Sequence, residues 1–214
     1  MKKILILPLL FFAIGQINLN AQLLLGIDES HLELTNNNVP SYSIKTISLS
    51  TGVQLEYAEQ GNANGIPVIL LHGFTDSWRS FAGILPHLPT SLHVFALSQR
   101  GHGNSSKRAA SYKAEDFAKD VSEFIKEKKL SSVVIVGHSM GSTNAQCFAA
   151  NYPAQTKALV LVGSFASFDK PGVTEFKKVI DELNDPIDSS FIAEFQKSTF
   201  TRPVSTEVLK GGCR

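Results

Sequence analysis

The chain has 214 residues, of which 43% are hydrophobic and 18% charged, and its formal net charge is +1 at pH 7. This length suits one sizeable hydrophobic core, and the composition excludes a disordered or fibrous protein. The near-neutral charge argues against nucleic acid or an anionic surface as a partner.

The first 21 residues predict a secretory signal peptide. Two lysines give a basic start, an apolar stretch follows over residues 4–17, and Ala21 is a small residue at the cut. This order is typical of a signal peptide that is cleaved after Ala21. A membrane anchor or a buried helix is the alternative, but the stretch is shorter than a span of about 20 apolar residues and contains Pro8 and Gly15. We therefore expect a periplasmic or secreted protein with no stable membrane insertion after cleavage.

Residues 22–42 predict an irregular mature N-terminus, and the predicted core occupies residues 43–164. Its opening is a hairpin, because strand-like segments at 43–50 and 53–59 flank the turn Thr51-Gly52. We expect these two strands to pair in antiparallel fashion.

Buried strands then alternate with helices. Continuous apolar runs predict strands that are buried on both faces. Amphipathic spacing predicts helices between them, most clearly where apolar residues recur at positions 117, 121, 124 and 125. The predicted strands cover 67–71, 93–97, 133–136 and 158–162, and the predicted helices cover 77–88, 114–128 and 139–151. This alternation predicts an α/β fold with a mostly parallel sheet flanked by helices.

Residues 165–214 predict a helical cap region. Segments 175–183 and 188–196 have helical spacing, no buried strand follows them, and the sequence ends on Gly-Gly-Cys-Arg. We therefore expect the last core strands to be missing and the chain to end early. Phenylalanines in this region either line an apolar acyl site or pack against one another and the core: Phe176, Phe191, Phe195 and Phe200.

One five-residue string carries the chemistry. Gly137-His138-Ser139-Met140-Gly141 fits G-x-S-x-G, and it lies between a predicted buried strand and a predicted helix. In this context the pattern is typical of a sharp turn that exposes a nucleophilic serine. A chance match is the alternative, but both flanking elements favour Ser139 as a nucleophile.

A serine nucleophile needs donors for the oxyanion of its tetrahedral intermediate. One donor is the backbone N–H of Met140, directly after the nucleophile. The second is expected from the loop after an earlier strand, where Gly73 lets the backbone N–H of Phe74 turn toward Ser139. The histidines beside glycines, His72 and His102, are expected to brace their loops and not to take part in the chemistry.

Three motifs in order, His72-Gly73-Phe74, Arg100-Gly101-His102-Gly103-Asn104-Ser105 and the Ser139 string, resemble the α/β-hydrolase superfamily. The most similar branch holds cap-bearing serine esterases, C–C hydrolases and perhydrolases, and the resemblance covers roughly residues 44–200. It implies a Ser139 nucleophile, oxyanion N–H groups from Phe74 and Met140, a small-molecule acyl substrate, and neither cofactor nor metal. Related dehalogenases and epoxide hydrolases place an aspartate at the elbow, so Ser139 argues against both. The chain departs from the pattern at Ser98-Gln99, where an aspartate commonly precedes the arginine.

The resemblance also implies an acid and then a histidine after the serine. The six histidines all precede Ser139, and Asp169 is a weak candidate for the acid. We therefore expect that neither the triad acid nor the histidine is present in this chain.

Three hypotheses follow. The first is a serine hydrolase that cleaves carboxylic esters or related acyl compounds through an acyl-enzyme. The second is a catalytically incompetent fragment or pseudo-hydrolase that lacks the triad acid and histidine. The third is a ligand-binding descendant without enzymatic activity.

Cys147 and Cys213 are the two cysteines. Their spacing favours one buried thiol and one thiol in the tail, although export would permit a disulfide between them.

Overall fold

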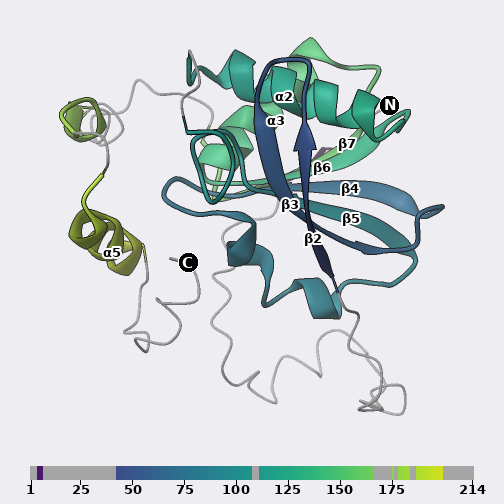
Figure 1. The fold of residues 1–214 in the computed structure, drawn as a ribbon, viewed down its shortest axis with the longest axis horizontal. Coiled ribbons are helices and arrows are strands. Elements are labelled where there is room, and N and C mark those ends of the chain that lie inside the picture. The colour runs from purple at the N-terminus through teal and green to yellow at the C-terminus, as the bar shows by residue number, and fades with distance from the viewer. Residues whose placement is uncertain are drawn as a thin grey trace.

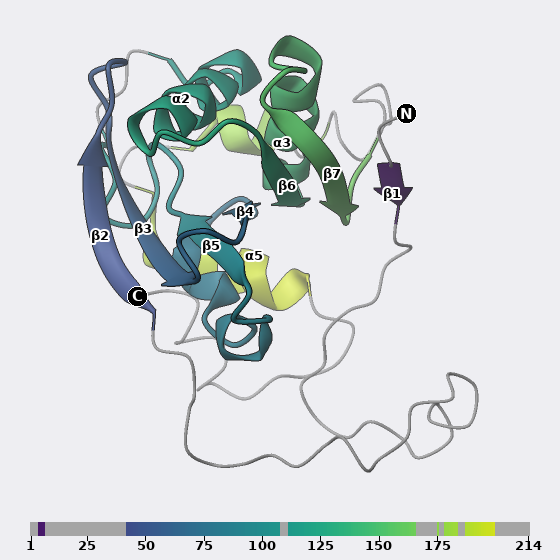
Figure 2. The ribbon, with the colours of Figure 1, turned by 90° about the vertical axis from the view of Figure 1, so that its right-hand side faces the viewer.

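The computed structural model describes residues 4–6, 42–107, 111–165, 175, 178–183 and 187–199. Its centre is one twisted sheet of seven strands in the order β1-β7-β6-β4-β5-β3-β2 (Figures 1 and 2). The strands are β1 (Ile4–Ile6), β2 (Ser43–Ser48), β3 (Gln54–Gly61), β4 (Ile66–Leu71), β5 (Leu92–Leu97), β6 (Val133–His138) and β7 (Thr156–Val162).

The sheet is mostly parallel, with an antiparallel opening. Strand β4 pairs in parallel with β5 and β6, β6 pairs in parallel with β7, and β3 pairs in antiparallel fashion with β2 and β5. The predicted α/β fold and the predicted N-terminal hairpin are therefore confirmed.

Two helices cover one face of the sheet, α2 (Ala114–Glu127) and α3 (Met140–Asn151) (Figure 1). The opposite side carries two short 3-10 helices, η3 (Trp78–Phe81) and η4 (Leu85–His87), and helix α5 (Ser189–Ser198) (Figure 2). Helices α2 and α3 lie within two residues of their predicted bounds.

The prediction of one continuous helix over 77–88 is wrong, because η3 and η4 occupy this segment. Pro86 lacks the N–H that would donate to the carbonyl of Ala82 in an α-helix. Gly83 adds a cost of about 1 kcal/mol in a helix interior. The apolar side chains still point inward, and Trp78, Phe81 and Leu85 are buried.

The core has two layers, one on each face of the central strands. On β4, Ile69 and Leu71 pack under α2 and α3 with Phe124 and Phe148. The alternate residues of β4, Val68 and Leu70, pack on the other face with Trp78 and Leu85. Because side chains alternate along a strand, burial on both faces produces the continuous apolar runs seen in the sequence.

The short strand β1 lies at the edge of the sheet. Ile4, Leu5 and Ile6 pair in parallel with Leu159, Val160 and Leu161 of β7. These three residues belong to the predicted signal peptide, whose bounds remain a prediction. In the described part of the chain, no helix is both long and apolar enough to cross a membrane.

Residues 178–181 are helical and α5 follows, within the predicted cap region. No strand follows β7 among residues 163–165, 175, 178–183 and 187–199. Phe176, Phe200, Asp169 and Cys213 lie outside the described residues, and Cys147 is a free thiol.

Candidate active site

Ser139 stands at the sharp turn between β6 and α3. Its backbone has φ +50° and ψ −117°, a left-handed conformation that is rare for a residue with a side chain. The Ser139 N–H donates to the carbonyl of Val162 at 3.0 Å, and its carbonyl accepts from the Ser142 N–H at 2.8 Å. The turn is therefore fixed from β7 on one side and from α3 on the other. A strained turn of this kind is typical of a nucleophile elbow.

The two glycines of the elbow permit close backbone packing. A Cβ on Gly137 would lie 2.3 Å from the carbonyl oxygen of Gly141, and a Cβ on Gly141 would lie 2.2 Å from that of Leu71. Neither gap admits a methyl group. Helix α3 can therefore begin directly against β6 and β4.

The loop that follows β4 packs against the elbow. A Cβ placed on Gly73 would lie 3.4 Å from Ser139 Cβ and 3.2 Å from His138 Nδ1. Residues 73–76 form a turn in which the Asp76 N–H donates to the Gly73 carbonyl at 3.3 Å. The structure thus brings the loop of the predicted oxyanion donor Phe74 next to Ser139. Met140 is the first residue of α3, where backbone N–H groups have no acceptor within the helix.

His72 braces this loop. Its Nδ1 donates to the Gly73 carbonyl at 2.8 Å, and its Nε2 accepts from the Gln99 N–H at 3.0 Å. Complete burial lowers the pKa of His72 to about 3, so the ring is neutral. Gln99 also donates to the His72 carbonyl at 2.9 Å and accepts from Asn144 of α3 at 2.8 Å. The expected structural role of His72 agrees with these bonds.

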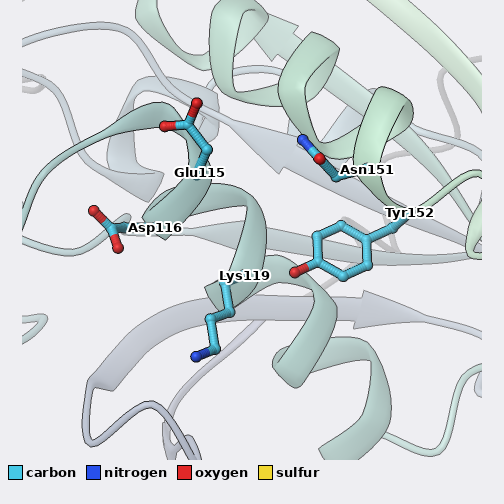
Figure 3. Close-up of a pocket in the computed structure, with 5 residues that line it drawn as sticks. All are labelled: Glu115, Asp116, Lys119, Asn151 and Tyr152. Atoms are coloured by element: carbon cyan, nitrogen blue, oxygen red, sulfur yellow. The ribbon is translucent and has the colours of Figure 1, made fainter.

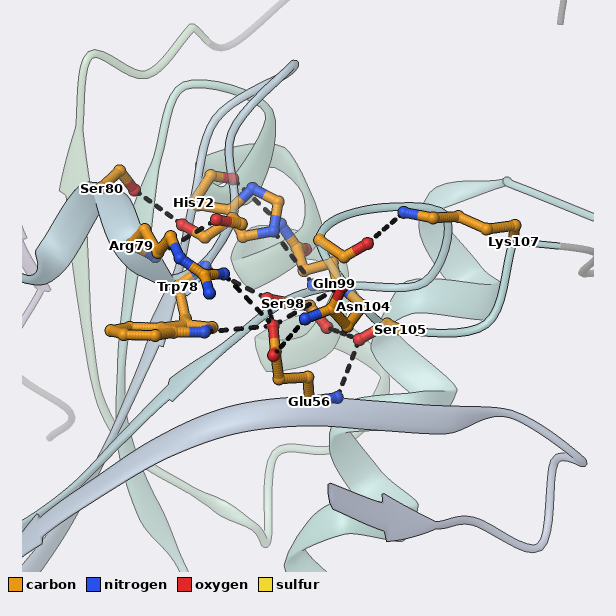
Figure 4. Close-up of polar contacts among 12 residues, drawn as sticks. Glu56, His72, Trp78, Arg79, Ser80, Ser98, Gln99, Asn104, Ser105 and Lys107 are labelled. Carbon is orange, nitrogen blue, oxygen red and sulfur yellow. Dashed lines mark hydrogen bonds and ion pairs between the residues drawn. The ribbon is translucent and has the colours of Figure 1, made fainter. Parts of the chain in front are cut away.

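A buried carboxylate lies beneath the next loop. Glu56 Oε2 accepts from Trp78 Nε1 at 3.1 Å and from Ser98 Oγ at 3.3 Å, and Oε1 accepts from Asn104 Nδ2 at 2.7 Å (Figure 4). Arg79 lies 3.7 Å away. Ser98-Gln99 stands where the resemblance leads us to expect an aspartate, and Ser98 Oγ donates to the Glu56 carboxylate of β3.

A buried ion pair fixes the same loop to α2. Arg100 Nε and Nη2 each donate to Asp120 at 2.7 Å, and Nη1 donates to the Ser111 carbonyl at 2.8 Å. Hydrogen bonding to Asp120 raises the pKa of Arg100 above its ordinary value. His102 Nδ1 bonds the Arg100 carbonyl at 2.9 Å, which agrees with its expected bracing role.

Helix α5 reaches the loop after β4 from the other side. Gln196 Nε2 donates to Asp76 Oδ1 at 3.3 Å, and the Phe195 ring meets the Phe74 ring edge-on with 5.7 Å between centroids. Phe191 stacks on Phe195 at 6.4 Å. Of the four phenylalanines predicted in the cap, these two are described, and Phe195 lies against the loop.

Sequence reasoning missed Asp76 and Gln196. Burial raises the pKa of Asp76 to about 7, opposed by its bond to Gln196. The one signal was the position of Asp76, a carboxylate four residues after His72 in the loop that follows β4.

Among the described residues, no side chain forms a hydrogen bond with the Ser139 hydroxyl. No histidine among them hydrogen-bonds the Ser139 hydroxyl, and Asp169 is not described. Among the described residues, no group of three or more His, Cys, Asp or Glu side chains could hold a metal ion.

A polar pocket of about 350 Å³ lies between the start of α2 and the end of α3 (Figure 3). Its lining residues are Glu115, Asp116, Lys119, Asn151 and Tyr152. Asn151 is the last residue of α3 and Ser139 precedes the first, so this pocket lies at the opposite end of the helix from the elbow.

Comparison with known proteins finds curated hydrolases of similar sequence. Lipase 1 of Psychrobacter immobilis is 34% identical over 152 residues, which cover 70% of this chain and 47% of the lipase. Epoxide hydrolase 3 of Mus musculus is 29% identical over 114 residues, which cover 52% of this chain and 31% of that protein. This chain therefore spans about half the length, or less, of these curated relatives.

The crystal structure of a hydrolase from Pseudomonas aeruginosa PA01 matches the fold with a TM-score of 0.68 at 21% identity, covering 79% of this chain and 65% of that one. The sequence model described as "alpha/beta hydrolase fold" matches residues 66–197, which include β4, the elbow and all but the last residue of α5. The chain belongs to the α/β-hydrolase fold family.

Proposed function

We propose that this protein is a serine hydrolase that acts on carboxylic esters or related acyl compounds through an acyl-enzyme. The observation that carries the proposal is the strained backbone of Ser139, at φ +50° between β6 and α3, with the Gly73 loop against it. A serine held this way presents its hydroxyl outward, above the N-terminus of a helix whose dipole favours developing negative charge.

In the proposed reaction, Ser139 Oγ attacks the carbonyl carbon of the acyl group. The backbone N–H groups of Phe74 and Met140 then hold the negative oxygen of the tetrahedral intermediate. The leaving alcohol departs, an acyl-Ser139 ester remains, and water releases the acid. A general base must take the proton of Ser139 Oγ and return it to the oxygen of the leaving alcohol, and it must then take a proton from the attacking water.

Similarity to both a lipase and an epoxide hydrolase leaves two reaction classes to compare. An ester-forming carboxylate at the elbow suits epoxide opening, whereas a serine suits acyl transfer. Ser139 therefore favours acyl substrates. The basic and apolar start of the sequence supports the further proposal that the protein is exported.

Fluorophosphonate labelling tests the nucleophile. We expect the probe to label one site, which peptide mapping assigns to Ser139, and we expect Ser139→Ala to abolish labelling. Hydrolysis of p-nitrophenyl butyrate is measured beside it. Labelling that persists unchanged in Ser139→Ala would overturn the proposal.

An acyl-binding protein without turnover is the second candidate. Removal of triad members leaves only the residual catalysis of the oxyanion hole and binding. Under this candidate, p-nitrophenyl butyrate quenches the fluorescence of the protein on binding but is not hydrolysed. Turnover at ordinary enzyme rates would exclude it.

A further inference from the structure

Helix α5 presents one buried residue, and that residue is polar. This residue is Gln196, whose side chain is 8% exposed. Its neighbours Glu194 and Lys197 form an ion pair at 2.7 Å, with side chains that are 73% and 52% exposed. Burial of an amide costs free energy unless the amide is hydrogen-bonded. The site at which Gln196 bonds therefore influences where the helix rests.

Gln196 donates to the carboxyl of Asp76, 120 residues earlier in the chain. Oδ1 accepts from Gln196 Nε2 at 3.3 Å, whereas Oδ2 faces the Gly73 backbone. A Cβ on Gly73 would lie 3.2 Å from Asp76 Oδ2 and 3.4 Å from Ser139 Cβ, so both border the same small volume. One carboxyl thus joins the cap helix to the loop beside the nucleophile.

An aromatic contact joins the same two segments as this hydrogen bond. The residue before Gln196, Phe195, meets Phe74 edge-on at 5.7 Å, and Phe74 lies two residues before Asp76. Edge-to-face pairs of this geometry are favourable. Consecutive residues of α5 therefore engage the loop of the proposed oxyanion donor, one by a hydrogen bond and one by a ring.

We propose that Asp76 is a positioning residue of the acyl site, whose carboxyl seats α5 over the loop after β4 through Gln196, so that the seated helix restricts the acyl chains that reach Ser139. The clause on acyl chains rests on the proposed function. The clause on seating does not, because it concerns only the contact between α5 and the loop.

The seating depends on pH with a definite sign. Burial raises the pKa of Asp76 to about 7 from an ordinary value of 3.8. When α5 leaves, water reaches the carboxyl and the pKa falls, so the seated state binds the proton more tightly. Seating is most favourable below about pH 4, weakens as the pH rises, and becomes constant above about pH 7.

The charged and titratable groups around Asp76 do not offset this effect. On the loop itself, His72 is neutral, because burial lowers its pKa to about 3. On the elbow, desolvation lowers the pKa of His138. On η3, Arg79 pairs with Glu56, and on α5, Lys197 pairs with Glu194. Among the described residues, no cation pairs with Asp76.

Hydrogen exchange of residues 187–199 in the full chain tests the seating, at pH 5.5 and pH 8 and corrected for intrinsic rates. In the wild type we expect at least about tenfold stronger protection at pH 5.5. Asp76→Asn should abolish the pH dependence and keep the protection, because an amide oxygen still accepts from Gln196 but does not titrate. Gln196→Leu should lose about fivefold to tenfold of the protection at pH 5.5.

Glu194→Gln and Lys197→Gln are the matched controls, because both change a polar residue of the same helix at an exposed position. We expect wild-type exchange in both. Protection in Gln196→Leu equal to that of the wild type would overturn the seating, as would a wild-type pH dependence in Asp76→Asn.

Competition between a short-chain and a long-chain alkyl fluorophosphonate tests the acyl clause. We expect the ratio of the two labelling rates at Ser139 to change at least about fivefold in Gln196→Leu and to stay unchanged in Glu194→Gln. An unchanged ratio overturns the acyl clause. If no probe labels Ser139, the proposed function fails and the acyl clause fails with it, whereas the exchange experiment still decides the seating.

Discussion

The Ser139 elbow and helix α5 meet at the same loop, but they are held in different ways. The elbow rests on backbone packed against backbone, where Gly137 and Gly141 leave no room for a methyl group. Helix α5 contacts the same loop through side chains, with Gln196 its buried residue. Backbone packing fixes the elbow in one geometry. Helix α5 is held by a few side chains, so we expect that it can move while the core stays folded.

We expect the largest loss of stability when the buried ion pair between Arg100 and Asp120 is broken. Arg100→Ala leaves the Asp120 carboxylate buried without its guanidinium partner. We expect a loss of about 3–5 kcal/mol in the free energy of unfolding, measured by urea denaturation. A loss below about 1 kcal/mol would show that water solvates the Asp120 carboxylate in this variant. Lys45→Ala, which breaks a more exposed pair with Glu59, is the control and should cost at most about 1 kcal/mol.

Gly141→Ala tests the elbow directly. The new Cβ would meet the carbonyl oxygen of Leu71 at 2.2 Å, so α3 must move away from β4. We expect a loss of about 3 kcal/mol and a strong loss of fluorophosphonate labelling. Gly52→Ala is a comparison without a clash, because its Cβ would meet nothing within 4 Å, and its φ of +78° should limit the cost to about 1–2 kcal/mol of backbone strain. Equal costs for the two variants would contradict the role of close packing.

Thr75 lies in the loop between the two regions, and its substitution should stabilise the protein. Its φ is +66°, which strains a β-branched residue, and among the described residues its buried hydroxyl has no hydrogen-bond partner. Glycine removes both penalties, at some cost in the entropy of the unfolded chain. We therefore expect Thr75→Gly to raise the free energy of unfolding by about 1 kcal/mol. A destabilised variant would show that the threonine side chain makes a favourable contact.

We expect the smallest effect on the free energy of unfolding from a substitution in α5. Phe195→Ala removes the edge-on contact with Phe74 and the stacking on Phe191. We expect the free energy of unfolding, measured by urea denaturation, to change by less than about 0.5 kcal/mol, while exchange of residues 187–199 accelerates about fivefold. If the unfolding midpoint falls as far as in Gly141→Ala, α5 is part of the core and the comparison is wrong.

Much of the fold could be predicted from the sequence, because strands buried on both faces produce continuous apolar runs. The runs at 67–71 and 93–97 became β4 and β5 almost without change. The segment 77–88 shows where periodicity misleads. Its apolar residues are buried, but Pro86 and Gly83 divide the backbone into two 3-10 helices, so the pattern records burial without fixing the type of helix.

The elbow could be predicted because its residues are consecutive, and the local conformation of Ser139 follows from a five-residue motif. The contact between Asp76 and Gln196 could not, because it joins residues 120 positions apart through a single hydrogen bond. Glu56 is similar. Its carboxylate reaches the loop at 98–105 from a different strand, so its bonds to Ser98 and Asn104 join residues more than 40 positions apart and could not be predicted.

The N-terminal residues that belong to the proposed signal peptide also form an edge strand of the sheet, because β1 pairs with β7. Residues 4–6 cover the outer edge of β7, and the carbonyl of Val162 at the end of β7 accepts from the Ser139 N–H. Cleavage after Ala21 would take β1 away and expose the unpaired backbone groups of a strand that touches the elbow. An exposed edge of this kind readily pairs with another chain. Processing at the N-terminus would then change the width of the sheet and the tendency of the protein to self-associate in a single step.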